Sequence, residues 1–318
     1  TITDREEAGI TMRFYFAILV GKLLNLAINI IDKKRGTNFS GKYAMKIDPR
    51  FVSHIKGIDE SKVLFITGTN GKSTTTNFIH HIFTSNGKKI ICNLEGANLI
   101  YGIATALLKN CSLTGKVSAD YYIFETDERF LPLIKEQLHA KNLLITNLQK
   151  DQVQRNGDPD FIYRKLKSVI SEDMTLFVNN DEPRSASLGD LSNKVITYGV
   201  EKHLQAFNKD ETYPSMACPR CGHGIKFRYY NNDNIGKFEC RHCDFKSAEE
   251  ADYQIRDINF ENGSFTYNGK LFSMPYNTPF MLYNYASAIA VAREMLNLSD
   301  EDICKSFNNF KNISGRIE

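Results

Sequence analysis

The stretch "FITGTNGKSTTTNF", residues 65–78, joins an apolar run to a helical pattern through a glycine-containing turn. The common phosphate-binding pattern G-x-x-x-x-G-K-[ST] would place its first glycine at position 66. This chain has Ile66 there, and its glycine, Gly68, comes two positions later. The run "VLFIT" (63–67) predicts a buried strand, and a helix is expected to begin near Lys72. A strand, a turn and a helix in this order can surround phosphates with backbone N–H groups.

The polar residues of this loop have expected tasks. Lys72 would reach the terminal phosphates of a nucleotide, and the Ser73 hydroxyl would bind Mg²⁺. The residues expected to contact the phosphates are Gly68, Thr69, Asn70, Gly71, Lys72, Ser73 and Thr74. The sequence therefore predicts a nucleotide-binding loop with its own glycine spacing.

The bulk composition narrows the class of protein. The chain has 318 residues, of which 42% are hydrophobic, enough for one large core or two smaller ones. Its net charge of +3, from 40 Lys and Arg against 37 Asp and Glu, is too balanced to predict a nucleic-acid partner. Seven cysteines, four of them in two C-x-x-C pairs, suit a reducing cytoplasm better than a disulfide framework.

Residues 12–31, "MRFYFAILVGKLLNLAINII", are apolar over a length that could cross a bilayer. Polar residues interrupt the run at Arg13, Lys22, Asn25 and Asn29, so a packed or surface-lying amphipathic helix is favoured. A true span and a loose membrane contact remain alternatives. We expect residues 1–58 to form an N-terminal helical segment of a cytoplasmic protein, with at most peripheral contact at the inner face of the membrane.

Short apolar runs then alternate with helical patterns. The expected strands are 63–67, 89–92, 121–125, 143–146, 175–179 and 194–199, and they are apolar throughout. Such strands are typical of a mainly parallel α/β sheet that is buried on both faces by helices. Residues 59–318 are therefore expected to form one such domain. A polar, turn-rich insert interrupts it at residues 205–255.

The insert carries the pattern C-x-x-C, eighteen residues, C-x-x-C, formed by Cys218, Cys221, Cys240 and Cys243. Four cysteines in two such pairs predict a closed, tetrahedral and structural Zn²⁺ site. Disulfides and free thiols are the alternatives. Zinc ribbons also bind nucleic acids, and basic and aromatic residues surround this one, but acidic residues flank it and no nucleic-acid partner is expected.

The loop "TGTNGKST" (67–74) resembles that of the Mur ligases and their relatives, the folylpolyglutamate and cyanophycin synthetases. This resemblance implies that ATP phosphorylates a carboxylate and that an amine then attacks the acyl phosphate. Four further stretches extend it: "YIFETDE" (122–128), "TNLQKDQVQRNG" (146–157), "FVNNDEP" (177–183) and "NYASAIAVA" (284–292). It implies that Glu125 binds Mg²⁺ and acts in catalysis together with Lys72. It also implies that Asn284 contacts adenine, and that Arg316, in the closing "GRIE", lies by the nucleotide.

Two departures from the family pattern concern the metal and the adenine, and one further lysine lies near a modified family position. Gln152 stands where the family has a histidine that is often tied to a second metal, and an amide is a weaker ligand than imidazole. Lys167 falls near the place of a carbamylated lysine in several Mur ligases. Phe280 and Met281 replace the usual His-Asn before the adenine asparagine.

The four-cysteine insert, "NLEGAN" (93–98) and "ETDE" together resemble one branch of the family, the synthetase subunits of lipid II isoglutaminyl synthases. This resemblance implies ATP-dependent amidation of the α-carboxylate of D-isoglutamate in the lipid II stem peptide, with ATP, Mg²⁺ and Zn²⁺. A GatD-like glutamine amidotransferase would supply ammonia as the partner in a heterodimer. Asn93, Glu95 and Asn98 would lie on the substrate side. The family's third, C-terminal domain is expected to be absent from these residues.

Two other functions remain open. A folylpolyglutamate or cyanophycin-type ligase would add an amino acid rather than ammonia. A non-catalytic zinc-ribbon scaffold or nucleic-acid-binding protein would not turn over ATP. The remaining cysteines, Cys92, Cys111 and Cys304, are isolated and do not resemble a glutaminase nucleophile, so glutamine hydrolysis is expected to occur on another chain.

Overall fold

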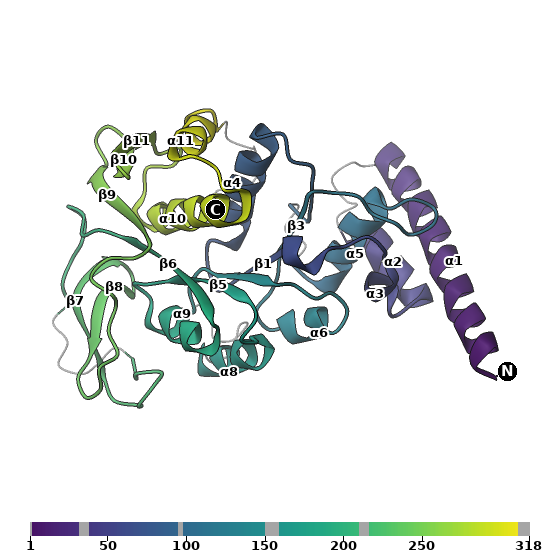
Figure 1. Ribbon diagram of the computed structural model, residues 1–318, viewed down its shortest axis with the longest axis horizontal. Helices are drawn as coiled ribbons and strands as arrows, with labels where there is room; N and C mark the ends of the chain where they lie inside the picture. Colours follow the sequence, from purple (N-terminus) through teal and green to yellow (C-terminus); the bar gives the residue numbers. More distant parts are fainter. Residues whose placement is uncertain (1, 32–37, 95–97, 150–158, 210–215, 311–318) are drawn as a thin grey trace.

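The computed structural model describes residues 2–31, 38–94, 98–149, 159–209 and 216–310. Within them a mixed sheet of nine strands forms the centre, in the order β11-β10-β9-β6-β5-β4-β1-β3-β2 (Figure 1). The strands are β1 (Val63–Thr67), β2 (Ile90–Cys92), β3 (Tyr121–Glu125), β4 (Asn142–Ile145), β5 (Thr175–Asn179), β6 (Lys194–Val200), β9 (Tyr253–Asn259), β10 (Ser264–Tyr267) and β11 (Lys270–Ser273). From β2 to β9 neighbouring strands are parallel, and β10 and β11 add an antiparallel edge.

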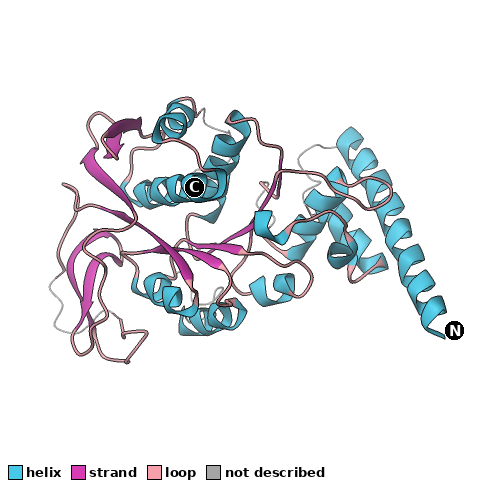
Figure 2. Cartoon of the chain, viewed as in Figure 1, coloured by secondary structure: helices cyan, strands magenta, loops and turns pink. Residues whose placement is uncertain are grey.

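Helices cover both faces of the sheet (Figure 2). The helices are α1 (Ile2–Ile31), α2 (Phe39–Ile47), α3 (Phe51–His54), α4 (Lys72–Ser85), α5 (Ile100–Asn110), α6 (Leu131–Lys135), α8 (Pro159–Val169), α9 (Pro183–Leu188), α10 (Pro279–Leu296) and α11 (Asp300–Asn308), with short 3₁₀ turns η1 (Glu60–Lys62) and η2 (Gly189–Leu191). Helices α4, α10 and α11 lie on one face. The helices α5, α6, α8 and α9 lie on the other, where α1, α2 and α3 pack around α5.

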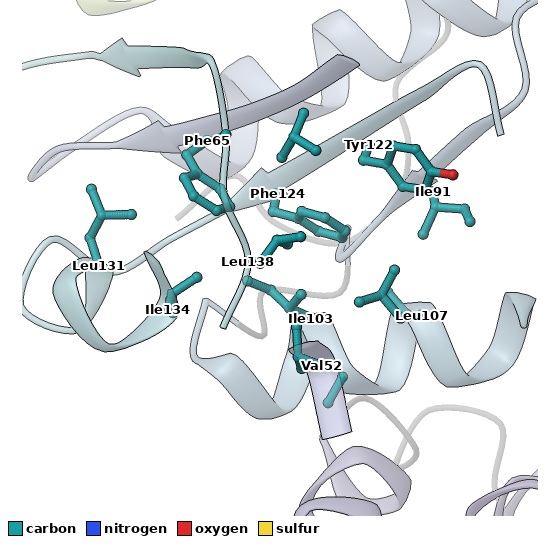
Figure 3. Close-up of a cluster of buried hydrophobic side chains, with 14 of the residues drawn as sticks. Val52, Phe65, Ile91, Ile103, Leu107, Tyr122, Phe124, Leu131, Ile134 and Leu138 are labelled. Carbon is teal, nitrogen blue, oxygen red and sulfur yellow. The ribbon is translucent and has the colours of Figure 1, made fainter. Parts of the chain in front are cut away.

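Alternate side chains of each parallel strand enter different cores. In β1, Val63 and Phe65 face the α5 side, whereas Leu64 and Ile66 face α4 and α10. Figure 3 shows Phe65 beside Phe124 of β3, over Ile103 and Leu107 of α5. Each fully buried aliphatic or aromatic side chain contributes about 1.5–3 kcal/mol. This double burial explains why the strands are apolar throughout.

The predicted α/β sheet is confirmed, and all six expected strands are present within one residue of their expected ends. The predicted insert contains a separate antiparallel hairpin, β7 (Ile225–Asn232) and β8 (Ile235–Cys240). The chain then returns to the sheet as β9, parallel to β6. Nothing in the structure tests the expected domain boundaries.

The N-terminal apolar stretch is helical and docked. By length and composition α1 could cross a membrane, since its window Thr11–Ile28 has a mean hydropathy of 1.4. However, Phe14, Ala17 and Ile18 belong to the core on the α5 side of the sheet. One face of α1 is therefore part of the folded domain.

Candidate nucleotide and zinc sites

The predicted phosphate loop connects β1 to α4. Its two glycines have positive φ angles, +131° at Gly68 and +84° at Gly71, which favour glycine over other residues. A Cβ atom at Gly68 would overlap the Thr146 hydroxyl, and one at Gly71 would overlap the side-chain oxygen of Asn284. The displaced glycine spacing is thus matched by close neighbours in the loop after β4 and on α10.

A second loop, after β4, holds the phosphate loop in place. The Asn147 side chain accepts a hydrogen bond from the Asn70 N–H at 3.1 Å and donates one to the Asn70 carbonyl at 3.0 Å. The Asn147 carbonyl also accepts the Thr69 N–H at 2.8 Å. The Gln149 N–H donates to the Thr69 hydroxyl at 3.1 Å. These bonds fix the backbone of residues 69 and 70 before any ligand arrives.

Lys72 opens α4 and points back over its own loop. Its ammonium group donates to the carbonyls of Gly68 and Thr69, the latter at 3.1 Å. It also forms an ion pair of 3.3 Å with the Glu128 carboxylate, with the two side chains 12% and 5% exposed. Ser73 and Thr74 follow in the first turn of α4 and are half-buried. Lys72 is therefore neutralised by Glu128 and faces the loop.

Glu125 ends β3 directly beside β1, paired in register with Ile66. Its side chain is buried. Asn93, which follows β2, accepts the Glu125 N–H at 2.9 Å and donates to the Glu125 carbonyl at 2.8 Å. The amide of Asn93 therefore positions the backbone of Glu125, whereas its expected substrate contact stays a prediction.

The rest of the "ETDE" turn is also fixed. Asp127 donates its N–H to the Asn98 carbonyl at 2.9 Å, so Asn98 contributes backbone support to the turn. Its carboxylate forms an ion pair of 2.5 Å with Arg129. Burial raises the pKa of Asp127, but the hydrogen bonds from Arg129 outweigh it and hold the pKa below its ordinary value. The turn thus presents Glu128 to Lys72 from a rigid base.

Asn284 lies on α10 against the helical end of the phosphate loop. It is buried, and its side-chain oxygen accepts the Thr75 hydroxyl at 3.3 Å. Asn284 therefore contacts the first turns of α4 in addition to any role at adenine, which stays a prediction. Phe280 is exposed at the start of α10. Glu95, Gln152 and Arg316 lie outside the described residues, and Lys167 is exposed on α8.

The four predicted zinc ligands come together. The sulfur atoms of Cys218, Cys221, Cys240 and Cys243 all lie within 4.8 Å of one another. The separation is 3.8 Å for Cys218 and Cys243 and 3.5 Å for Cys221 and Cys240, too long for disulfides. It matches the roughly 3.8 Å expected between thiolates bound tetrahedrally at about 2.3 Å from zinc. The chemistry and spacing of this donor set fit Zn²⁺.

Backbone groups prepare this cluster for a metal. The N–H groups of His242 and Cys243 donate to the Cys240 sulfur at 3.4 and 3.5 Å. Burial raises the pKa of the Cys240 thiol, but these bonds outweigh it and lower the pKa to about 6. His223 and His242 stack on one another with ring centroids 3.8 Å apart.

A buried polar network joins the ribbon to the main sheet. The carboxylate of Asp181, after β5, accepts the Val200 N–H at 3.0 Å and the Tyr283 hydroxyl at 3.1 Å. Asn231 of β7 donates to the Val200 carbonyl at 3.0 Å and to the Tyr283 hydroxyl at 3.2 Å. Tyr283 precedes Asn284, so the ribbon and the phosphate loop both contact the same turn of α10.

Comparison with known proteins places this geometry in a family. Residues 66–220 match the Mur ligase middle domain. The chain is 31% identical to the lipid II isoglutaminyl synthase (glutamine-hydrolyzing) subunit MurT of Staphylococcus aureus over 312 residues, covering 96% of this chain and 69% of that protein.

The chain belongs to the MurT branch of the Mur ligase family.

Other MurT and Mur ligase relatives agree. The MurT subunit of Streptococcus pneumoniae is 27% identical, covering 89% of this chain and 63% of its own length. A pseudomurein peptide ligase type C from Methanothermus fervidus has the same fold, with a TM-score of 0.67 and 24% identity over 85% of this chain and 53% of its own. The chain thus spans about two thirds of these MurT proteins and about half of the solved structure.

Two residues of this MurT family member were missed from the sequence. Glu128 has a signal in the sequence, because it is a second carboxylate three residues after Glu125. Asn147 has no comparable signal. Its bonds to Asn70 join segments 77 residues apart, and no local pattern indicates them.

Proposed function

We propose that this chain carries the ATP-dependent step in the amidation of lipid II. The observation that supports it most is the meeting of Lys72 and the Glu125 turn at the carboxyl ends of the adjacent strands β1 and β3. Ligands of open parallel sheets bind at such strand ends. The identity with MurT across nearly the whole chain then favours amidation over the other Mur-type reactions.

In the proposed reaction a carboxylate oxygen of the D-isoglutamate residue attacks the γ-phosphorus of ATP and ADP leaves. Ammonia then adds to the carbonyl carbon of the acyl phosphate, loses a proton, and phosphate departs to give the amide. The main task of the protein in such transfers is positioning and charge stabilisation. No residue of this chain needs to form a covalent bond.

The chain's own residues supply the nucleotide site. The N–H groups at the start of α4 face the phosphates, and the positive φ angles of Gly68 and Gly71 let the loop backbone curve around them. Lys72 exchanges Glu128 for the phosphates. Ser73 and Glu125 would be the oxygen donors for Mg²⁺, which when bound would neutralise charge on the transferred phosphoryl group.

Two described cysteines outside the ribbon, Cys111 and Cys304, are poor candidates for glutamine hydrolysis. Burial raises the pKa of the Cys111 thiol and of the Cys304 thiol, which keeps both protonated. Cys304 donates to the Leu271 carbonyl at 3.1 Å. Ammonia is therefore proposed to come from a GatD-like amidotransferase partner, with the zinc ribbon in a structural role.

The experiment uses the protein as its gene encodes it, with Mg²⁺, ATP, ammonium and lipid II, and measures ADP formation. The proposal expects ADP formation that depends on both lipid II and ammonium and is lost in Glu125→Gln. Glu136→Gln, an exposed glutamate in the turn after α6, is the matched control and keeps activity. ADP formed with a folate and glutamate instead would favour the folylpolyglutamate-type reaction and contradict the proposal.

A further inference from the structure

Helix α1 has a docked inner face. Gly21 lies so close to α5 that a Cβ atom there would overlap Leu108, and Gly115 is equally close to the Phe14 ring. The Phe14 ring lies 5.6 Å from that of Phe51, centroid to centroid. Asn25 is buried on the same side. These contacts hold α1 along the protein and leave no lipid-facing surface on this side, so a transmembrane orientation is disfavoured.

The outer face of α1 is apolar and open. Met12 is 73% exposed and Leu26 is 62% exposed, at either end of a continuous row. The row consists of Met12, Tyr15, Phe16, Leu19, Leu23 and Leu26. Because an α-helix turns about 100° per residue, these side chains share one face, opposite Phe14 and Gly21. Single exposed apolar residues are ordinary, but a row along four turns marks an interaction surface.

The N-terminal segment that carries this row has a net positive charge. At about 100° per residue, Arg13 and Lys22 lie on opposite sides of the helix, one beside each edge of the apolar row. Residues 11–57 contain nine Lys and Arg and two Asp, a net charge of +7, whereas the other residues contain 31 Lys and Arg and 35 Asp and Glu, a net charge of −4. Asp4, Glu6 and Glu7, in the first turns of α1, are among those other acids.

Basic side chains of the N-terminal segment also differ from those of the main domain in their salt bridges. Surface arginines of the main domain mostly form ion pairs, such as Arg184 with Asp160 at 2.9 Å and Arg220 with Asp190 at 2.6 Å. Within the described part of the chain, no salt bridge involves Arg13, Lys22 or Lys46. Their charge is available to an anionic partner.

We infer that the outer face of α1 lies in the interface of a lipid bilayer with anionic headgroups. Apolar side chains would enter the boundary between headgroups and acyl chains, while Arg13 and Lys22 meet the negative surface. The aromatic rings of Tyr15 and Phe16 suit that boundary. A second copy of this chain would bring two net-positive segments together, which the charge disfavours.

This inference rests on the helix alone and not on the proposed reaction. It is tested by flotation of the chain with vesicles of phosphatidylglycerol and phosphatidylcholine, and with vesicles of phosphatidylcholine only. We expect the chain to float with the anionic vesicles and at least tenfold less with the neutral ones. Leu19→Glu/Leu23→Glu should reduce flotation at least tenfold. The control Leu204→Glu, at a residue that is 95% exposed far along the sequence, should float like the wild type.

Four outcomes would overturn the inference. The wild-type chain could fail to float, or Leu204→Glu could lose flotation as fully as the α1 variant. Retention on vesicles after a carbonate wash would indicate a spanning helix. A dimer in solution that Leu19→Glu/Leu23→Glu dissociates, without vesicle binding, would assign the face to a second copy. Thermal melting that is unchanged in the α1 variant shows that loss of flotation is not loss of fold.

Discussion

The ammonium group of Lys72 lies 3.3 Å from the Glu128 carboxylate, and both side chains are nearly buried. Glu128 comes from the turn after β3, and Asp127 in the same turn is held by Arg129. Lys72 is the residue expected to meet the terminal phosphates. The lysine is therefore paired with a carboxylate that a bound nucleotide has to replace.

Replacing Glu128 with Gln should tighten nucleotide binding. The variant removes a carboxylate that competes for Lys72 and repels phosphate, so we expect ADP affinity to rise up to about tenfold, or 1.4 kcal/mol. Titration calorimetry measures it, with Glu136→Gln as the exposed control. Weaker binding in Glu128→Gln would mean that this carboxylate helps to hold the nucleotide or its metal.

Replacing Lys72 with Ala should have the opposite effect. Loss of the cation that faces the terminal phosphates should lower Mg-ATP affinity at least about tenfold, or 1.4 kcal/mol. Lys88→Ala, an exposed lysine just past the far end of α4, is the matched control. Equal affinity in the Lys72 variant and the wild type would refute the phosphate-loop assignment.

The four-cysteine cluster should bind one zinc ion per chain, which elemental analysis measures. Cys218→Ser or mild chelation should loosen β7 and β8 and expose them to proteases, because the ribbon's own core is small. ATP binding should persist, since the phosphate loop rests on β1, β4 and α10. Loss of ATP binding on chelation, with the α/β core intact, would show that zinc is more than structural.

Asp181→Asn should destabilise the fold. The buried carboxylate accepts the Val200 N–H and the Tyr283 hydroxyl, and an amide can place a donor against them, at a cost of about 1–3 kcal/mol. Urea unfolding measures it.

The difference in free energy of unfolding between the wild type and Asp181→Asn should change with pH in a definite direction. Burial raises the pKa of Asp181 above its ordinary value, so the folded state favours the protonated carboxyl. The stability that the protonated Asp181 carboxyl provides is complete below its pKa in the unfolded chain, about 3.9. This stability falls as the pH rises through the pKa of Asp181 in the folded protein. The advantage of the wild type over Asp181→Asn should therefore shrink above about pH 4. An advantage that grows with pH would show that the hydrogen-bond donors outweigh burial.

The sequence was sufficient for features whose signals are local. Apolar runs predicted the buried parallel strands, Gly87 indicated the end of α4, and the paired cysteines predicted the zinc ribbon. Pairings between distant segments were not predictable. Lys72 and Glu128 are 56 residues apart, and Tyr283 and Asp181 are 102 residues apart, so their meeting depends on the strand order. The edge strands β9–β11 were also not assigned, because the run at 253–260 mixes charged and apolar residues.

The central claim is that this chain activates a lipid II carboxylate for ammonia made elsewhere. Its most direct test is mass spectrometry of lipid II treated with the protein as its gene encodes it, ATP, Mg²⁺, a GatD-like partner, and glutamine labelled with heavy nitrogen at its side-chain amide. The account predicts that the label enters the stem peptide as a carboxamide. Omitting either the partner or ATP should abolish this incorporation. A stem peptide that keeps its free carboxylate and contains no heavy nitrogen, in the presence of a partner that hydrolyses glutamine, would contradict it.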